Sequence, residues 1–261
     1  MSKKLGLALG SGGSRGISHI GFLKALEEAG IKPDYISGCS MGAVVGGCYA
    51  LGMSAEKMHK IVTKLKFSDI FDLSLNPYHN GALLATKKMR KQLEKYLKDY
   101  NFNQTAIPFT CVATDLVKGE TYIFNGEEKI LDGVTASSTI PGVFKPVAYN
   151  GMVLVDGGVK CRVPIDQVRQ MGAEVVVAVD ALGKLRESNK KYNVFSVLLR
   201  TFDICDSEIT SSRREKQNPD LFLEPELGDM VMYKFKDLEM AYQKGYETGK
   251  SNVDKIKELI K

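Results

Sequence analysis

The sequence contains no tryptophan, only three histidines and five cysteines, and each scarcity argues against a class of protein. The cysteines are odd in number and never form a Cys-x-x-Cys pair, which argues against a disulfide framework and a zinc site and is typical of reduced thiols in the cytoplasm. The net charge of +5 favours anionic surfaces only weakly. A charge this small does not indicate a nucleic-acid-binding protein, and the lack of tryptophan makes an aromatic platform for stacking bases less expected.

Long hydrophobic runs are also missing: no stretch reaches the roughly 18 apolar residues that a membrane span needs. The apolar start of the chain imitates a signal peptide, but it stops at a group of glycines and is followed by Arg15 and His19. Because a leader has no such continuation, we interpret this start as a first strand. We expect a soluble protein of the cytoplasm.

Of the 261 residues, 44% are hydrophobic and 26% are charged, as in a folded globular chain. Short aliphatic runs alternate with longer helical patterns, which favours a mainly parallel sheet with helices on both faces. We therefore expect an α/β protein, a three-layer α/β/α sandwich. No linker interrupts the chain, so residues 1–261 are expected to form a single domain whose part from about residue 183 is mainly helical.

The pattern predicts six strands and seven helices. The strands are expected at 5–9, 35–37, 109–114, 121–124, 152–155 and 174–179, and the helices at 16–29, 41–51, 55–64, 86–97, 164–171, 194–205 and 235–259. Asn150-Gly151 lies between two apolar runs and predicts a hairpin, because both residues accept the positive φ of a type I′ turn. This hairpin places Asp156 at the exit of a short strand.

The most informative motif is Gly38-Cys39-Ser40-Met41-Gly42, which follows a predicted strand and opens a predicted helix. In such a strand-to-helix elbow the central serine has a strained backbone, and only small residues fit two positions away on either side. The first turn of the helix then directs N–H groups toward negative charge beside the serine. The motif indicates a nucleophilic Ser40.

A second glycine-rich motif, Gly10 to Gly16, joins the first strand to the first helix. Its exposed N–H groups suit a phosphate or an oxyanion. The spacing does not match the dinucleotide motif Gly-x-Gly-x-x-Gly, and no Gly-Lys-Ser/Thr of a P-loop follows. An oxyanion is therefore the better match.

A serine nucleophile needs a base, and the histidines are His19, His59 and His79. The triad of α/β-hydrolases requires a histidine late in the chain, so that triad is not expected here. His19 lies close to the glycine motif, and a secondary role for it stays open. A carboxylate is then the expected base: Asp156 begins an Asp-Gly-Gly motif, while Asp115 and Asp180 follow other strands and remain alternatives.

Three ordered motifs, Gly-x-Gly-Gly-x-Arg-Gly, Gly-x-Ser-x-Gly and Asp-Gly-Gly, together resemble the patatin-like phospholipase family. The likeness is greatest to small bacterial members related to the catalytic domain of neuropathy target esterase, and it extends from about residue 5 to 182. The resemblance implies that Ser40 is the nucleophile and Asp156 the general base of a Ser-Asp dyad. Ser11 departs from the pattern, since many relatives have glycine there.

The resemblance also implies roles for the residues around the dyad. It places the oxyanion hole at Gly12, Gly13, Ser14 and Arg15, the nucleophile elbow at Gly38 and Gly42, and the rest of the proton-acceptor motif at Gly157 and Gly158. Within the first group, Gly12 and Gly13 would offer N–H groups and Arg15 would support the loop. No metal or organic cofactor is implied.

The expected function is that of a serine esterase that hydrolyses acyl esters of lysophospholipids or phospholipids through an acyl-enzyme. Two alternatives stay open: an acyltransferase on the same dyad, and a catalytically silent protein that binds lipid. Whether the protein contacts a membrane surface is also open, with 67–78 and 194–202 as candidate apolar segments. The sequence gives no oligomeric state.

Overall fold

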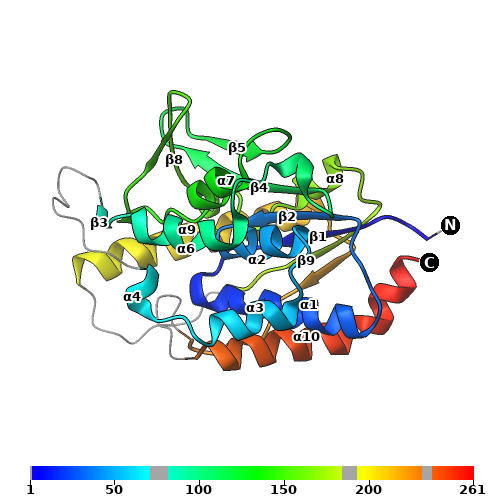
Figure 1. Ribbon diagram of the computed structural model, residues 1–261. Helices are drawn as coiled ribbons and strands as arrows, with labels where there is room; N and C mark the ends of the chain where they lie inside the picture. The colour runs from blue at the N-terminus through cyan, green and yellow to red at the C-terminus, as the bar shows by residue number, and fades with distance from the viewer. Residues whose placement is uncertain (1, 71–81, 184–192, 231–236) are drawn as a thin grey trace.

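The computed structural model describes residues 2–70, 82–183, 193–230 and 237–261, and its largest feature is an eight-stranded sheet (Figure 1). Its strands are β1 Leu5–Leu9, β2 Tyr35–Cys39, β4 Phe109–Asp115, β5 Glu120–Phe124, β7 Val147–Tyr149, β8 Met152–Asp156, β9 Val175–Val179 and β10 Leu221–Leu223. Two further short strands, β3 Ala82–Leu84 and β6 Gly142–Phe144, pair with each other.

The helices connect and cover these strands. The α-helices are α1 Ser18–Glu28, α2 Met41–Ala50, α3 Ala55–Val62, α4 Phe67–Ile70, α6 Lys87–Leu97, α7 Ile130–Ser137, α8 Ile165–Gln170, α9 Val194–Gln217 and α10 Leu238–Leu259. Short 3₁₀ turns are η1 Gly13–Ile17, η2 Phe102–Gln104 and η3 Gly157–Val159. Among the described residues, none of the helices has the length and apolar character needed to cross a bilayer.

The strand order is β10-β9-β1-β2-β4-β8-β7, with β5 paired to β4 outside this path. The strands from β10 to β4 run parallel, whereas β8 pairs antiparallel with β4 and β7 antiparallel with β8. Parallel strands end at the same edge of a sheet, and an open α/β sheet carries its site there. The loops that follow β1 and β2 therefore meet at that edge.

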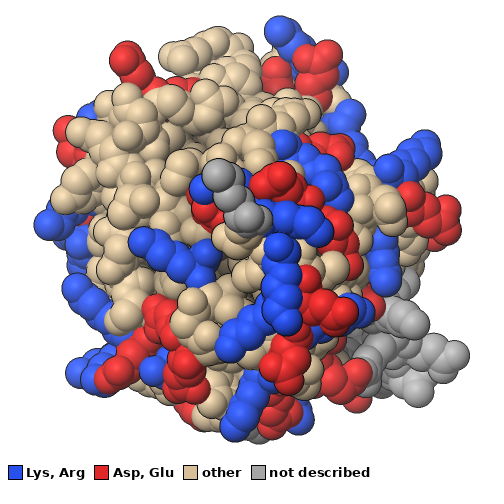
Figure 2. Space-filling view, turned by 90° about the vertical axis from the view of Figure 1, so that its right-hand side faces the viewer, with Lys and Arg blue, Asp and Glu red and all other residues tan. Residues whose placement is uncertain are grey.

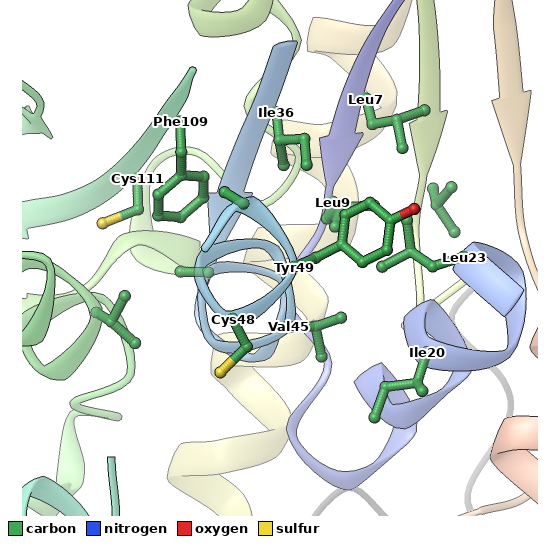
Figure 3. Packing of buried hydrophobic residues seen from close by; sticks show 14 of the residues in the cluster. Leu7, Leu9, Ile20, Leu23, Ile36, Val45, Cys48, Tyr49, Phe109 and Cys111 are labelled. Carbon is green, nitrogen blue, oxygen red and sulfur yellow. The ribbon is translucent and has the colours of Figure 1, made fainter. Parts of the chain in front are cut away.

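Alternate side chains of the central strands enter two separate cores, so the sheet is covered on both faces. Leu7, Leu9 and Ile36 join a large cluster with residues of α1 and α2, as Figure 3 shows. Ala8 and Val176 point the other way, into a smaller cluster with α8. This two-sided burial confirms the expected mainly parallel sheet with helices on both sides.

Helix α10 crosses α1 at very short range because both helices carry glycine at the crossing. A Cβ atom on Gly21 would lie 1.9 Å from the main-chain oxygen of Tyr242, and one on Gly245 would lie 1.8 Å from that of Ser18. Backbone contact of this kind leaves no room for any side chain. The C-terminal helix is therefore packed directly onto the helix that follows the glycine motif.

All six predicted strands and seven predicted helices are present, with ends that shift by a few residues except in α9. Helix α9 continues to Gln217, twelve residues beyond its predicted end, and α4, α7, β3, β6 and β10 were not expected. The hairpin is present, with Asn150 at φ 47° and Gly151 at φ 79° in the turn between β7 and β8.

Charged side chains of both signs are interspersed on the face near the two termini, as Figure 2 shows. No broad area of a single sign covers this face. It lies at the end of the sheet opposite the carboxyl ends of the parallel strands, because β1 begins beside the N-terminus (Figure 1).

The α1–α10 crossing makes a testable prediction. Gly245→Ala is expected to lower the free energy of unfolding by about 3 kcal/mol or more, since the new methyl group meets backbone that cannot move independently. Denaturant unfolding would measure this change. Gly47→Ala in α2 is the matched control: its Cβ would lie 3.3 Å from a ring carbon of Phe109, a side chain rather than backbone, so any loss of stability should be much smaller than that of Gly245→Ala. Equal effects of the two substitutions would contradict the close-crossing argument.

Candidate functional site

Ser40 lies between the end of β2 and the start of α2 with an unusual backbone conformation. Its φ is 52° and its ψ is −121°, a combination that L-residues rarely adopt and that costs on the order of 1 to 3 kcal/mol. Contacts of the main chain hold it: Ser40 N donates to Ser137 Oγ at 2.9 Å, and Ser40 O accepts from Val44 N at 3.0 Å. This is the geometry of a nucleophile elbow.

The two flanking glycines are required because backbone approaches both of them closely. A Cβ on Gly38 would lie 2.6 Å from the Cα of Ala43, and one on Gly42 would lie 2.1 Å from the main-chain oxygen of Leu9. Helix α2 can therefore begin directly against the ends of β1 and β2. Its free N–H groups and the positive end of its dipole lie beside Ser40.

Asp156 reaches Ser40 through the neighbouring strand β4. In the sheet, Val112 of β4 pairs with Cys39 at the end of β2, and the next residue, Ala113, pairs with Asp156 at the end of β8. The ends of β2 and β8 therefore flank the same part of β4. The carboxylate accepts a hydrogen bond from Gly158 N at 2.8 Å, and the Ser40 hydroxyl lies near enough to lower the pKa of this carboxyl. Two side chains that are 116 positions apart in the sequence are thus neighbours at this edge of the sheet.

The carboxyl group of Asp156 is buried, with 4% of the residue exposed. Burial raises its pKa from 3.8 to about 6, and the hydrogen bonds from Ser40, Gly158 and Cys39 oppose part of this rise. Desolvation is the dominant cause because it disfavours the charged form. The result is a carboxylate that is more basic than an ordinary aspartate and remains ionised at neutral pH.

The glycine motif is fixed at the same edge by main-chain hydrogen bonds. Gly10 N donates to Val179 O at 2.9 Å and Ser11 N donates to Arg162 O at 3.0 Å. Arg15 Nε donates to Ala181 O at 3.0 Å, which ties the loop to the residues after β9. Among the described residues no acceptor binds the N–H groups of Gly12 and Gly13, so these two donors are available to an oxyanion.

His19 holds the start of this loop through a hydrogen bond to Gly10. Within the part of the chain that the structure describes, it makes no hydrogen bond to Ser40. Its Nε2 lies 2.8 Å from Gly10 O, and since a carbonyl oxygen only accepts, Nε2 carries the proton. Nδ1 is buried without a partner in the described part of the chain. Burial lowers the pKa of His19 to about 4, so the ring stays neutral and acts as a hydrogen-bond donor.

The other candidate bases lie elsewhere. His59 binds Glu239 at 2.7 Å and stacks on Tyr242, so its ring is held by α10. His79 lies outside the described residues. Asp115 Oδ1 accepts from Val117 N at 3.0 Å, and Asp180 is paired with Arg162 at 2.7 Å. Of the three aspartates considered, Asp156 is the one whose pKa the Ser40 hydroxyl lowers in the described structure.

An apolar cavity opens from Ser40 between α2, α3 and α6. It contains about 1180 Å³ of empty space, counting the part open to solvent, and its inner end is lined by Gly13, Ser14 and Ser40. Its walls are almost entirely aliphatic, with several flexible methionines, among them Met41, Met53, Met58 and Met89. Such a wall adapts to a flexible hydrocarbon chain.

The two candidate apolar segments are only partly described. Of 67–78, the structure describes α4, and Ile70 contributes to the cavity; the remainder lies outside the described residues. In 194–202, Val197 is 48% and Leu198 is 63% exposed, so these positions are not packed on the sheet. The side chains of Val194, Phe195 and Leu199 are not described.

Sequence reasoning missed a buried ionic cluster behind the glycine motif. Arg162 binds Asp180 at 2.7 Å and Asp206 of α9 at 3.1 Å, and all three side chains are at most 4% exposed. Burial raises the pKa of Asp206 to about 7, while Arg162 opposes the rise. In the sequence, Arg162 is marked only by its two apolar neighbours, Cys161 and Val163. A charged residue between apolar ones is also typical of an exposed turn, so this pattern did not indicate a buried cluster.

Comparison with known proteins agrees with this geometry. The sequence model described as Patatin-like phospholipase matches residues 7–169. An uncharacterized NTE family protein of Mycobacterium bovis is 36% identical over 70% of this chain and 50% of its own length. Lysophospholipase nte1 of Emericella nidulans is 26% identical over 98% of this chain and 18% of its own length. The chain thus spans half or less of the length of these relatives.

Solved structures share the fold. VipD from Legionella pneumophila superimposes with a TM-score of 0.58 at 15% identity, over 97% of this chain and 67% of that one. The type III effector protein ExoU gives a TM-score of 0.51 at 13% identity, over 97% of this chain and 53% of its own. With three ordered motifs meeting at one sheet edge and a family model that matches most of the chain, the protein belongs to the patatin-like phospholipase family.

Proposed function

We propose that this protein is a lipid ester hydrolase in which Ser40 is the nucleophile and Asp156 the general base. The observation that carries the proposal is the closeness of these two side chains beside an apolar cavity whose lining includes Ser40. Hydrophobic walls at a serine nucleophile favour a substrate with a hydrocarbon chain over a polar one. The family, and the name Lysophospholipase nte1 of one relative, support a phospholipid or lysophospholipid as substrate class.

The first step is the attack of Ser40 Oγ on the ester carbonyl carbon, while its proton moves to Asp156. The raised pKa of Asp156, about 6, makes this transfer less unfavourable than it would be to an ordinary carboxylate. When the tetrahedral intermediate collapses, the bond to the leaving alcohol breaks and the proton passes from Asp156 to that alcohol. An acyl-enzyme on Ser40 remains.

The negative oxygen of the intermediate needs preorganised donors. The N–H groups of Gly12 and Gly13 are the available ones on the glycine loop, and the first turn of α2 adds its dipole. Each such donor is worth about 3 to 4 kcal/mol in other acyl-transfer enzymes. Arg15 and His19 position the glycine loop. Arg15 donates to Ala181 O after β9, and His19 donates to Gly10 O at the start of the loop.

In the second step a water molecule replaces the alcohol. Asp156 takes a proton from the water as its oxygen attacks the acyl carbon, and then returns a proton to Ser40 Oγ, which leaves the fatty acid free. The same geometry would serve an alcohol acceptor, so product analysis in the presence of glycerol separates hydrolysis from transacylation.

We also propose that residues 1–261 act as one hydrolase domain. The close crossing of α10 on α1 supports this, because α1 directly follows the glycine motif. A C-terminal helix in such contact with the site-bearing helix is part of the same folded unit.

The dyad is tested by covalent labelling with a fluorescent fluorophosphonate and by hydrolysis of a p-nitrophenyl ester. Ser40→Ala is expected to abolish labelling, and Asp156→Asn to slow both reactions by about 10² to 10⁴, the usual contribution of a general base. His19→Gln is the control, because glutamine keeps an N–H donor for Gly10 O; it should retain labelling. Loss of activity in His19→Gln together with normal activity in Asp156→Asn would refute the assignment.

The pH dependence follows from the raised pKa of Asp156. Only the ionised carboxylate accepts a proton, so kcat/KM should rise with pH, reach half its plateau near pH 6 and stay flat above. A soluble short-chain ester measured from pH 4.5 to 8.5 provides the profile. An acid limb centred near pH 4 would show that burial does not raise the pKa of the base.

Stability should respond to the same shift, independently of catalysis. A carboxyl with a pKa near 6 when folded and 3.8 when unfolded stabilises the fold below pH 3.8, and this contribution is lost as the pH rises through 6. Asp156→Asn removes the charge and should therefore be more stable than the parent by about 3 kcal/mol at pH 8. The gain should shrink toward zero near pH 4. Asp254→Asn, an exposed site with the same charge change, should show no such gain.

A further inference from the structure

The surface around the cavity mouth is strongly basic, although the whole chain carries only +5. Residues 55–70, from α3 to α4, and 87–97, which form α6, together contain nine basic and three acidic residues. These 27 residues thus carry +6, and the remaining residues of the chain carry −1. The positive charge of the protein is therefore concentrated on these two segments. We call the exposed surface of these two segments the α3–α6 rim.

The rim is continuous with the cavity that leads to Ser40. A shallow groove on the outside of α3 and α6 is lined by three lysines (Lys57, Lys60 and Lys64), by Asp69, and by four residues that also line the cavity. These shared residues are Ile61, Leu65, Gln92 and Tyr96. A hydrocarbon chain that enters the cavity here passes between basic side chains first.

Most of this charge is not neutralised within the protein. Lys60 is paired with Glu56 and Arg90 with Asp132, and Lys88 binds Ser68 O at 3.4 Å, which joins α6 to α4. Lys57, Lys64, Lys87 and Lys91 are exposed, and no carboxylate among the described residues lies within ion-pair distance of them. Unpaired lysine side chains are all positive and repel each other, so gathering them on one surface does not stabilise the fold.

An exposed apolar residue lies beside the lysines. Leu83 of β3 is 46% exposed and precedes Lys87 by four residues. Basic residues around a partly exposed aliphatic one are the pattern by which proteins bind an anionic lipid interface. The face near the termini has no such segregation, because acidic and basic side chains alternate there (Figure 2).

We propose that the α3–α6 rim docks the protein on anionic lipid bilayers, with the mouth of the acyl cavity against the membrane. This inference rests on the proposed lipid ester hydrolysis, because it gives the cavity an acyl chain to receive from the bilayer. The positive rim attracts the anionic surface, and the chain of a lipid enters between α3 and α6 without crossing water. Attraction of this kind weakens as salt increases.

The test is binding to sedimented vesicles of phosphatidylcholine alone or with about 30 mol % phosphatidylglycerol, an anionic lipid. It uses the Ser40→Ala protein, so that hydrolysis does not alter the vesicles. We expect preferential binding to the anionic vesicles and a decrease of this binding at high salt. The rim variant Lys57→Gln, Lys64→Gln, Lys87→Gln, Lys91→Gln should lose about tenfold or more in partition coefficient.

A matched variant separates location from net charge. Lys3→Gln, Lys32→Gln, Lys255→Gln, Lys257→Gln removes the same charge from exposed positions in the terminal segments and before β2, and should bind within about twofold of the parent. An equal loss of vesicle binding in the two quadruple variants would overturn the proposal. Equal binding of the Ser40→Ala protein to both vesicle types would also overturn it. Loss of binding in Leu198→Ser with full binding in the rim variant would place docking on α9 and equally overturn it.

Failure of docking and failure of the proposed function are distinguishable. Fluorophosphonate labelling of Ser40 in the parent reports the catalytic site without any membrane, whereas vesicle binding of Ser40→Ala reports the rim without catalysis. Circular dichroism melting of both quadruple variants verifies that each is folded. A labelled protein that ignores anionic vesicles refutes the docking proposal alone.

Discussion

The backbone of Ser40, held at φ 52° between a strand and a helix, is the constraint on which the rest of the site depends. The chain reverses there within one residue, so α2 begins against the ends of β1 and β2, where only glycine fits at positions 38 and 42. That contact fixes the helix N-terminus beside the serine. It also determines which strand can supply the base, because β4, the next strand in the sheet, pairs with β8 on its other side. The strain at one residue is thus offset by the packing of four elements.

Burial of charge is the second constraint, and it acts against stability at the site. Asp156 is desolvated, and a few residues away Arg162 is enclosed with Asp180 and Asp206 in a cluster that contains more carboxylates than cations. Buried ion pairs seldom stabilise a fold relative to apolar packing, so this cluster is better understood as fixing position. Arg162 joins β9 and α9 through its side chain, while its main-chain oxygen holds Ser11 of the glycine loop. Functional sites commonly lower the stability of the fold in this way.

The central strands and the three motifs could be predicted from the sequence because each rests on local rules. Aliphatic runs give β1, β4 and β9, and a Gly-x-Ser-x-Gly pattern has few structural alternatives once a strand precedes it. Helix α7 and the second half of α9 were missed for a physical reason: the former contains glycine and β-branched residues, and the latter is polar and lacks a continuous apolar stripe. Ser137, whose Oγ accepts from Ser40 N, and Arg162 gain their roles only from contacts across the fold. No local pattern encodes such contacts.

The position of His19 explains physically why its ring does not suit the role of the base. A histidine base must exchange protons near neutral pH, yet the pKa of His19 is lowered to about 4 because its ring is fully buried. Its one proton is already committed to Gly10 O, which holds the start of the glycine loop. The ring therefore remains a neutral donor at every pH where the protein would work. In the proposed mechanism the proton of Ser40 passes to Asp156, a carboxylate that desolvation makes more basic than an ordinary aspartate.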